Sequence, residues 1–468
     1  MKTHSAISGT TIAAPATASG EGAISLIRVS GPKAVELVDN LFKAANRNTT
    51  LRDAAPYSVH YGRIEHPTTG ILDEVLVTVF RSPRSYTGED MVEISCHGSS
   101  YIRQKLLELI TGEGAQLAAP GEFTLRAFLN GKMDLSQAEA VADLIASESE
   151  ASHHIAMNQL RGGFSSKIAA LREKLVNFAS LIELELDFSE EDVEFADRTA
   201  FRQLLSDMRS EVQKLIDSFK LGNAVRKGIP VTIAGKPNVG KSTLLNALLN
   251  DERAIVSETP GTTRDTIEDT MVINGYNFRF IDTAGIRHTN DEIESMGIER
   301  TLKAIEQSLV VIYLFDMTTI TPQDIENELR FFSTIGGHED RTYILAANKT
   351  DLLGEAPSQL VTLLEMDMIF ISAKRHENLN LITNRLLSVV SQLKIDDSPA
   401  VCNVRHLDAL QRTLTAIDAI ETGLQGNLPA DLLSVDVRQA LHYLGEITGT
   451  ITNDELLGNI FSKFCIGK

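Results

Sequence analysis

The stretch "VTIAGKPNVGKST" (231–243) decides the fold of the central part of this chain. Gly235, Gly240, Lys241 and Ser242 match the pattern G-x-x-x-x-G-K-[ST], with an apolar strand segment before them and an apolar helical segment after them. In such a loop the backbone N–H groups surround phosphate oxygens, the lysine reaches the β- and γ-phosphates, and the hydroxyl binds Mg²⁺. The stretch therefore predicts a phosphate-binding loop in an α/β domain. A glycine-rich turn that binds nothing would not need this context.

Three segments downstream of the loop identify the nucleotide base. "DTAG" (282–285), "NKTD" (348–351) and "SAK" (372–374) each follow or end an apolar strand segment. Asp351 can accept hydrogen bonds from N1–H and the 2-amine of guanine, whereas adenine would leave this carboxylate unpaired at a high cost. Asn348 can face N7 and O6 of guanine, and the lysine of the same motif can cover the base. The segments predict GTP and disfavour ATP.

Magnesium and the γ-phosphate need ligands beyond the loop. Ser242 supplies one, and Thr263 of the predicted first switch, "RAIVSETPGTTRDT" (253–266), supplies another. Asp282 can hold the ion through water, and the N–H of Gly285 can face the γ-phosphate. The whole predicted GTP site comprises Asn238, Val239, Gly240, Lys241, Ser242, Thr243, Ser257, Glu258, Thr259, Pro260, Gly261, Thr262, Thr263, Asp282, Thr283, Ala284, Gly285, Asn348, Lys349, Asp351, Ser372, Ala373 and Lys374.

These motifs do not fix the residue that orients the attacking water. Many small GTPases place a glutamine directly after the glycine of DxxG. Here that position is Ile286, which cannot hydrogen-bond to water. Glu292, Glu294 and Arg287 lie on the following segment, and the motifs alone do not separate these candidates.

Composition limits the class of protein. The chain has 468 residues, a soft prior for about three domains, and a formal net charge of −19. Phosphate binding relies on clustered cations, so RNA contact would need a local basic patch or a basic partner. Three widely spaced cysteines argue against a disulfide framework or a zinc site and fit a reducing compartment. Without a secretory signal or a run of about 18 apolar residues, we expect a cytoplasmic protein.

The texture of the sequence changes along the chain. Residues 1–120 mix short β-rich runs with one helical stretch and predict an α+β domain. Residues 121–222 and 385–468 have helical periodicity, whereas 223–384 alternate apolar strands with helices, which indicates a parallel sheet. We predict a multidomain chain in which a Ras-like P-loop GTPase domain is inserted into a discontinuous all-helical domain.

The full length of the chain resembles the tRNA modification GTPase family called MnmE or TrmE. The N-terminal blocks are "GEGAISLIRVSG" (20–31), "SYTGEDMVEISCHG" (85–98) and "APGEFTLRAFLNGKMDLSQAEAVADLI" (119–145). The chain ends in the matching "FCIGK" (464–468). The GTPase motifs are shared with ribosome-assembly GTPases, so the N-terminal blocks and the ending carry the resemblance.

The resemblance implies chemistry that composition did not. Family members are homodimers that work with a flavoprotein, MnmG, which would carry the FAD. Together they install an aminomethyl-type group (aminomethyl or carboxymethylaminomethyl) on C5 of the wobble uridine of certain tRNAs, and the carbon comes from methylene-tetrahydrofolate. By motif position the folate contacts fall on Arg28, Glu93, Lys132 and Lys468. Cations suit the glutamate tail of folate, and a carboxylate suits the pterin amine and ring N–H.

The resemblance also implies that K⁺ stimulates GTP hydrolysis, in place of an arginine finger. The K⁺ ligands would be Asn238, Ser257, Thr259 and Thr262. Glu294 takes the position of the water-activating glutamate and, with Lys241 and Thr263, completes the expected catalytic set.

Two other functions share the GTPase motifs. A GTPase switch for ribosome assembly or signalling would not need the N-terminal blocks, and a one-carbon transferase could use GTP only as a timer. For the tail, we expect Cys465 to be a buried thiol; a lipid anchor and a catalytic thiol are the weaker alternatives. We expect the tail to complete the folate pocket.

Overall fold

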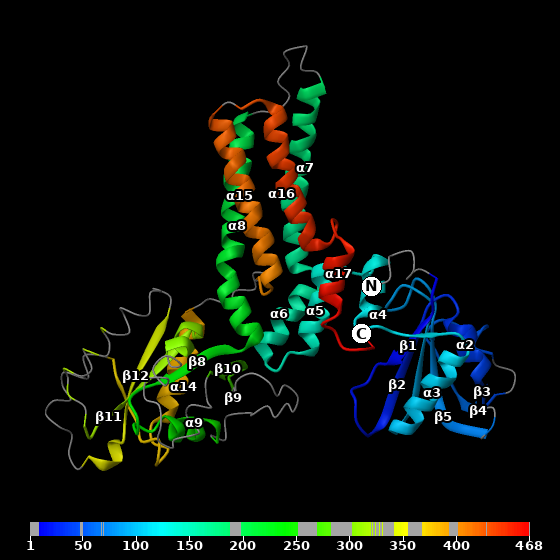
Figure 1. Cartoon of the computed structure of the whole chain (residues 1–468), viewed down its shortest axis with the longest axis horizontal. Helices are drawn as coiled ribbons and strands as arrows, with labels where there is room; N and C mark the ends of the chain where they lie inside the picture. Colours follow the sequence, from blue (N-terminus) through cyan, green and yellow to red (C-terminus); the bar gives the residue numbers. More distant parts are fainter. Residues whose placement is uncertain are drawn as a thin grey trace. The chain divides into compact units, whose positions relative to one another are not determined.

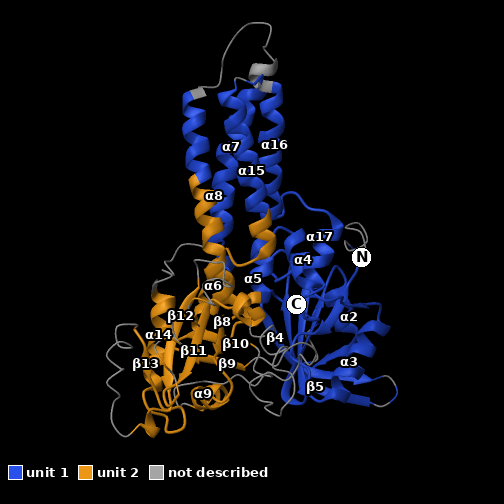
Figure 2. Cartoon of the chain, turned by 60° about the vertical axis from the view of Figure 1, so that its left-hand side comes forward, with its two compact units in different colours: residues 1–142, 159–209, 409–468 blue, residues 143–158, 210–408 orange. Residues whose placement is uncertain are grey.

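In the computed structural model the chain forms two compact units (Figure 2). Unit 1 comprises residues 1–142, 159–209 and 409–468, and unit 2 comprises 143–158 and 210–408. The structure describes residues 9–46, 50–66, 68, 70–187, 198–250, 269–281, 302–319, 321, 323, 327, 330, 341–353, 367–392, 401–426 and 428–467. Within these ranges, no helix has the length and apolar character that crossing a membrane requires.

The first part of unit 1 is a seven-stranded sheet in the order β3-β4-β5-β6-β2-β1-β7 (Figure 1). Its strands are β1 (Ile12–Pro15), β2 (Gly22–Ser30), β3 (Phe42–Ala44), β4 (Ser58–His66), β5 (Gly70–Phe80), β6 (Met91–Gly98) and β7 (Gln116–Leu117). Only the β1–β7 pair in this sheet is parallel. Helices α2 (Ala34–Leu41) and α3 (Ser100–Gly112) share a core with one face, because alternate strand residues such as Val77 and Ile94 point toward them.

The opposite face of this sheet is covered only in part among the described residues. Near β1, Ile12 and Ala14 pack with Phe123 of the following helix. Farther along the same face, Tyr61 and Leu76 are paired across β4 and β5 and are exposed. This face therefore carries exposed apolar side chains beside its covered end.

Helices make up most of the remainder of unit 1. They are α4 (Glu122–Leu129), α5 (Leu135–Ile145), α6 (Glu150–Leu160), α7 (Gly163–Asp187), α8 (Arg198–Lys227), α15 (Val404–Gln425), α16 (Ala430–Thr448) and α17 (Asp454–Phe461); parts of α5, α6, α8 and α15 belong to unit 2. Helices α7 and α16 lie side by side. Leu125, Leu135, Leu457 and Phe461 share one core, so segments from the two ends of the chain pack together.

Unit 2 contains a six-stranded sheet in the order β13-β12-β11-β8-β10-β9 (Figure 1). Its strands are β8 (Ile229–Ala234), β9 (Asp269–Ile273), β10 (Tyr276–Phe280), β11 (Val310–Asp316), β12 (Thr342–Asn348) and β13 (Ile369–Phe370). All neighbouring strands are parallel except the edge pair β9–β10. Two apolar clusters cover opposite sides of β11; one includes α9 (Lys241–Leu249) and α14 (Leu379–Gln392).

The fold class predicted from the sequence is confirmed: an α+β part, a discontinuous helical part and an inserted P-loop α/β part. Three of the β-rich runs in residues 1–120, "AISLIRVS" (23–30), "EVLVTVF" (74–80) and "MVEISCHG" (91–98), lie in β2, β5 and β6. The sequence reading did not find β4 or the antiparallel edge strand β9. The proposed domain boundaries at 120, 222 and 384 stay predictions.

Candidate functional site

The phosphate-binding loop lies between β8 and α9, at the carboxyl edge of the parallel sheet in unit 2. Gly235 has φ +147° and a Cβ there would clash with the carbonyl oxygen of Leu314 in the neighbouring strand. Gly240 begins α9 with φ +99°, and a Cβ there would clash with the side-chain nitrogen of Asn348. Both positions require glycine for conformation and for space. The loop therefore ends on a helix N-terminus, where backbone N–H groups favour an anion.

Lys241 lies in the first turn of α9, and its ammonium group points back into the loop. Its Nζ donates to the carbonyl oxygens of Gly235 at 2.8 Å and Lys236 at 2.9 Å. Burial lowers the pKa of this ammonium group below its ordinary value. Phosphate oxygens are stronger acceptors than carbonyl oxygens, so a bound nucleotide can replace these two contacts at a net gain.

Asn348 connects three loops of the predicted site. Its Nδ2 donates to the carbonyl oxygen of Val239 at 2.8 Å, and its Oδ1 accepts from the N–H of Ala373 at 3.0 Å. The side chain is 3% exposed. Both of its polar atoms thus hold the phosphate loop against the "SAK" segment, and a direct contact with guanine stays a prediction.

Asp351 is held in place by its neighbours. The hydroxyl of Ser372 donates to Asp351 Oδ1 at 2.8 Å and accepts from the N–H of Arg375 at 3.2 Å. The side chain of Asp351 is 6% exposed. A buried carboxylate of fixed orientation discriminates strongly between bases that do and do not donate to it.

Asp316, at the end of β11, was not predicted from the sequence. Its Oδ2 accepts from Lys349 Nζ at 2.5 Å, and its Oδ1 accepts from the hydroxyl of Thr318 at 2.6 Å. Burial opposes ionisation, but the bonds from Lys349 and Thr318 hold the pKa of this carboxyl below its usual range. The sequence could have indicated Asp316, because it is an acidic residue at the end of a buried parallel strand. The carboxyl ends of such strands meet at the edge of the sheet where ligands bind.

The remaining predicted residues of this site divide into two groups. Ser242 and Thr243 lie in the first turn of α9, Asn238 lies in the loop with φ 64°, and Lys374 is exposed. The predicted switch and hydrolysis residues lie outside the described residues; they are Ser257, Glu258, Thr259, Pro260, Gly261, Thr262, Thr263, Asp282, Thr283, Ala284, Gly285 and Glu294.

A second candidate site lies in unit 1, on the partly open face of the seven-stranded sheet. Arg28 and Glu93 are direct cross-strand partners on β2 and β6. Arg28 donates from Nε at 2.9 Å and from Nη2 at 2.7 Å, both to Glu93 Oε1. The guanidinium lies 5.1 Å from the ring centre of Tyr86 and 5.7 Å from that of Phe123. These contacts orient a half-buried cation at a polar and aromatic site.

Lys132 and the chain's C-terminal tail approach the same part of unit 1. The ammonium of Lys132 donates to the carbonyl oxygen of Pro83 at 3.1 Å, at the start of the loop that carries Tyr86. Gly467 packs so tightly on the backbone of Pro15 that a Cβ there would clash with its carbonyl oxygen. Pro15 lies one residue from the β1 partner of Arg28, whereas Lys468 lies outside the described residues.

The tail corrects one expectation. Cys465 is exposed, so its interpretation as a buried thiol is wrong. Phe461 and Phe464 fill the core instead, and Cys465 follows on the outer side of the turn. Cys96 and Cys402 are the buried cysteines.

A phosphate loop followed by a fixed aspartate, a lysine and a serine at neighbouring strand ends defines a P-loop protein of the GTPase class. Two family models match the chain: "MnmE helical domain" over residues 135–465 and "GTP-binding protein TrmE N-terminus" over 11–132. The chain therefore belongs to the MnmE family of tRNA modification GTPases.

Individual relatives are similar over nearly their whole length. The tRNA modification GTPase MnmE of Flavobacterium psychrophilum is 52% identical over 98% of this chain and 99% of its own. Its namesake in Flavobacterium johnsoniae is 53% identical with the same coverage, and that of Bacteroides thetaiotaomicron is 48% identical. The G domain of the T. maritima FeoB iron transporter aligns at 21% identity and a TM-score of 0.25, too weakly to support a conclusion.

Proposed function

We propose that this chain hydrolyses GTP and, with a flavoprotein of the MnmG type, installs an aminomethyl or carboxymethylaminomethyl group on C5 of the wobble uridine of certain tRNAs. The observation that carries this proposal is the Arg28–Glu93 pair, whose guanidinium contacts the rings of Tyr86 and Phe123, in a unit separate from the nucleotide site. A GTPase switch for ribosome assembly would need the nucleotide site alone.

The second site suits a reduced folate as carrier of the one-carbon unit. Among the described residues, both bonds from Arg28 go to Oε1 of Glu93. The other carboxylate oxygen, Oε2, could therefore accept hydrogen bonds from the pterin amine and ring N–H. Tyr86 and Phe123 offer apolar surface beside the cation. Lys132 and Lys468 would contribute positive charge for the glutamate tail, and methylene-tetrahydrofolate would supply the carbon.

Two cations would serve the nucleotide site. We assign Mg²⁺ to Ser242 and Thr263, where it would neutralise the β- and γ-phosphates. We assign K⁺ to Asn238, Ser257, Thr259 and Thr262, where it would take the place of an arginine finger. Asn238 has a positive φ of 64°, which turns this loop residue away from regular structure. Glu294 would orient the attacking water.

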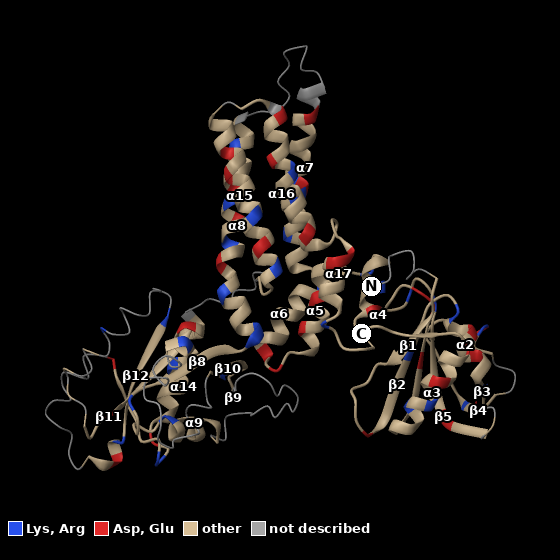
Figure 3. Cartoon of the chain, in the orientation of Figure 1, with Lys and Arg blue, Asp and Glu red and all other residues tan. Residues whose placement is uncertain are grey.

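Two surface properties of the chain support the proposed partners: an exposed apolar face in unit 1 and a net negative charge. The exposed apolar residues Tyr61 and Leu76 beside the Arg28 site support a homodimer through this face. Figure 3 shows that acidic and basic residues are interspersed along the ribbons of the long helices, and the net charge of the chain is −19. We therefore propose that a basic face of the flavoprotein, which carries FAD, supplies much of the attraction for tRNA in the cytoplasm.

Nucleoside mass spectrometry of tRNA from cells that lack this chain tests the proposal. We expect the modified wobble uridine to disappear and to return when the intact gene is supplied. Normal modification in the deletion strain would reject the function. Equal GTP hydrolysis rates in KCl and NaCl would reject the K⁺ assignment alone.

A further inference from the structure

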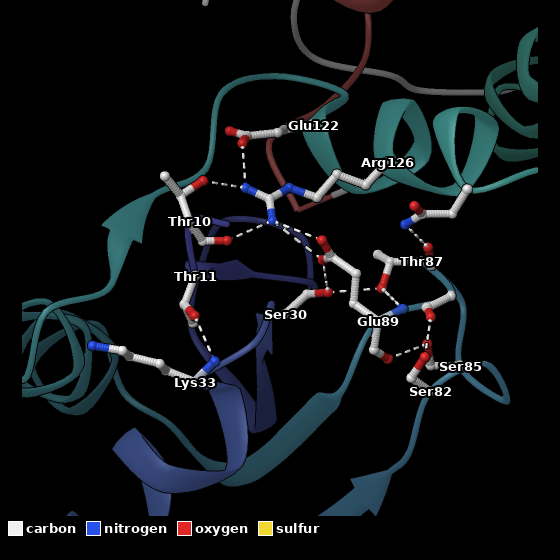
Figure 4. A network of polar contacts seen from close by, with 12 residues as sticks. Thr10, Thr11, Ser30, Lys33, Ser82, Ser85, Thr87, Glu89, Glu122 and Arg126 are labelled. Carbon is white, nitrogen blue, oxygen red and sulfur yellow. Dashed lines mark hydrogen bonds and ion pairs between the residues drawn. The ribbon is translucent and has the colours of Figure 1, made fainter. Parts of the chain in front are cut away.

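A buried arginine, Arg126, lies three residues after Phe123, whose ring contacts Arg28, and was not among the predicted site residues. It lies on α4 and is 1% exposed. Its Nη1 donates to the carbonyl oxygen of Thr10 at 2.7 Å and to the two carboxylate oxygens of Glu89 at 3.1 and 3.2 Å (Figure 4). Its Nη2 donates to the hydroxyl of Thr10 at 2.8 Å and to Glu122 at 2.9 Å. One guanidinium thus joins the N-terminal strand region, α4 and the loop of residues 81–90.

The charges in this network make Arg126 hard to replace. Glu89 and Glu122 are largely buried, with side chains 18% and 13% exposed. Without the guanidinium the two carboxylates would face each other with little water to screen them. Glu89 would then be free to move away from α4. Because Glu89 also accepts from the hydroxyl of Ser30 at 2.8 Å, its movement would disturb the end of β2, two residues from Arg28.

The 81–90 loop carries the ring that lies on Arg28. The phenol of Tyr86 and the hydroxyl of Thr124 on α4 lie 2.8 Å apart. Burial raises the pKa of Tyr86, so its hydroxyl remains protonated and available for this bond. On the same helix Phe123 lies on Arg28 and Arg126 holds Glu89. Consecutive parts of α4 thus fix both the aromatic rings around Arg28 and the loop from which one of them projects.

Other contacts tie the loop down independently of Arg126. Asn130, directly after α4, donates to the carbonyl oxygen of Thr87 at 2.7 Å and so ties the loop to this helix. Within the loop, Asp90 accepts from Arg81 at 3.0 Å and from the N–H of Ser82 at 2.9 Å, which keeps its two ends together. Loss of Arg126 is therefore expected to shift the loop, not to unfold unit 1.

We propose that Arg126 is a positioning residue of the one-carbon site, which sets the 81–90 loop through Glu89 so that Tyr86 holds Arg28 in line with Glu93. This inference rests on the proposed folate function. Arg126 itself is too buried to touch a ligand. Its replacement should weaken folate binding in unit 1 while GTP hydrolysis in unit 2 continues.

The test measures binding of 5-formyltetrahydrofolate, a stable reduced folate, to the full-length chain by calorimetry. We expect Arg126→Met to weaken binding at most about tenfold, the lower end of the range for residues that orient a binding group and no more than the loss of Arg28 itself. Hydrogen exchange should become faster in residues 81–90. Arg209→Met is the matched control, because Arg209 forms an exposed ion pair with Asp418 far along the same unit's helices; its binding should equal that of the wild type.

A second variant separates positioning from stability. In Arg126→Met combined with Glu89→Gln, one of the two buried carboxylates left unpaired by the first change becomes neutral, so thermal stability should recover in part while folate binding stays weak. Recovery of both together would show a merely structural role and overturn the inference. Should Arg126→Met fail to fold, Glu89→Gln alone must weaken binding, and unchanged binding there overturns it.

The outcomes distinguish the two levels of the argument. Wild-type chain that binds no reduced folate would reject the proposed folate site and the inference with it. Wild-type chain and Arg126→Met that bind equally well would reject only the inference.

Discussion

The two candidate sites hold their cations in opposite ways. In unit 2, among the described residues, the ammonium of Lys241 donates to two carbonyl oxygens and to no carboxylate, so its positive charge faces the predicted phosphate site. In unit 1 the guanidinium of Arg28 is already paired with Glu93. The first arrangement attracts an anion through net charge, whereas the second offers a nearly neutral pair whose geometry selects a ligand. Nucleotide affinity should thus depend on charge, and affinity for the one-carbon carrier on orientation.

The largest expected effect is at Lys241. Lys241→Ala removes the cation of the phosphate loop and should lower GTP turnover by about a thousandfold, the upper range for loss of one charge-stabilising group. Binding of reduced folate should not change. Turnover is measured by phosphate release and folate binding by calorimetry on the same preparation. Loss of both GTP turnover and folate binding would contradict the claim that the two sites work independently.

A hundredfold effect is expected at Asp351. Asp351→Asn replaces an acceptor with an amide that can donate, so GTP affinity should fall by about a hundredfold. Xanthosine triphosphate, which has an oxygen where guanine has its 2-amine, should bind better than to the wild type. Competition binding with both nucleotides measures the exchange. A variant with unchanged preference would place the base elsewhere.

A smaller loss is expected at Arg28. Arg28→Met keeps an apolar side chain between the rings of Tyr86 and Phe123 but removes the bonds to Glu93, and should weaken folate binding about tenfold. Arg52→Met is the control, because Arg52 and its ion-pair partner Glu36 in the same unit are both exposed. Raised salt should weaken GTP binding more than folate binding. The reverse order would contradict the contrast in charge.

The smallest effect concerns the tail. At mildly alkaline pH, Cys465 should react with iodoacetamide first because it is exposed. Burial raises the pKa of Cys96 to about 11 and that of Cys402 to about 12, so both remain protonated and unreactive. Reduced folate should slow the reaction of Cys465 several-fold and GTP should not, as peptide mass spectrometry can show. Equal protection by both ligands would argue against a tail that serves unit 1 alone.

The two candidate sites also differ in how far the sequence could predict them. The phosphate loop, "NKTD" and "SAK" are short motifs at strand ends, so spacing alone located the residues that the structure brings together around Asn348. The site in unit 1 joins Thr10, Arg28, Glu89 and Arg126, which are far apart in the chain. No local sequence pattern predicts that these residues lie together, and only the family resemblance indicated Arg28 and Glu93.

Two features that the sequence did not predict correctly, strand β9 and the exposure of Cys465, have a similar cause. The edge strand β9 has five residues, of which only Met271 and Ile273 are buried, so its sequence offers too short a pattern to predict a strand. The exposure of Cys465 depends on which residues of a short turn face inward, and two phenylalanines occupy the core there. In both places tertiary contacts decided what local sequence left open.

The contact of Gly467 with Pro15 joins two parts of the chain that are synthesised at very different times. The N-terminal sheet emerges early from the ribosome, but Gly467, which packs on Pro15 of β1, is made only after both segments of unit 2. Unit 1 can therefore gain this contact only after residues 143–158 and 210–408 of unit 2 have been synthesised. A truncated product that stops before Gly467 would keep every strand of the N-terminal sheet but lose this packing on Pro15.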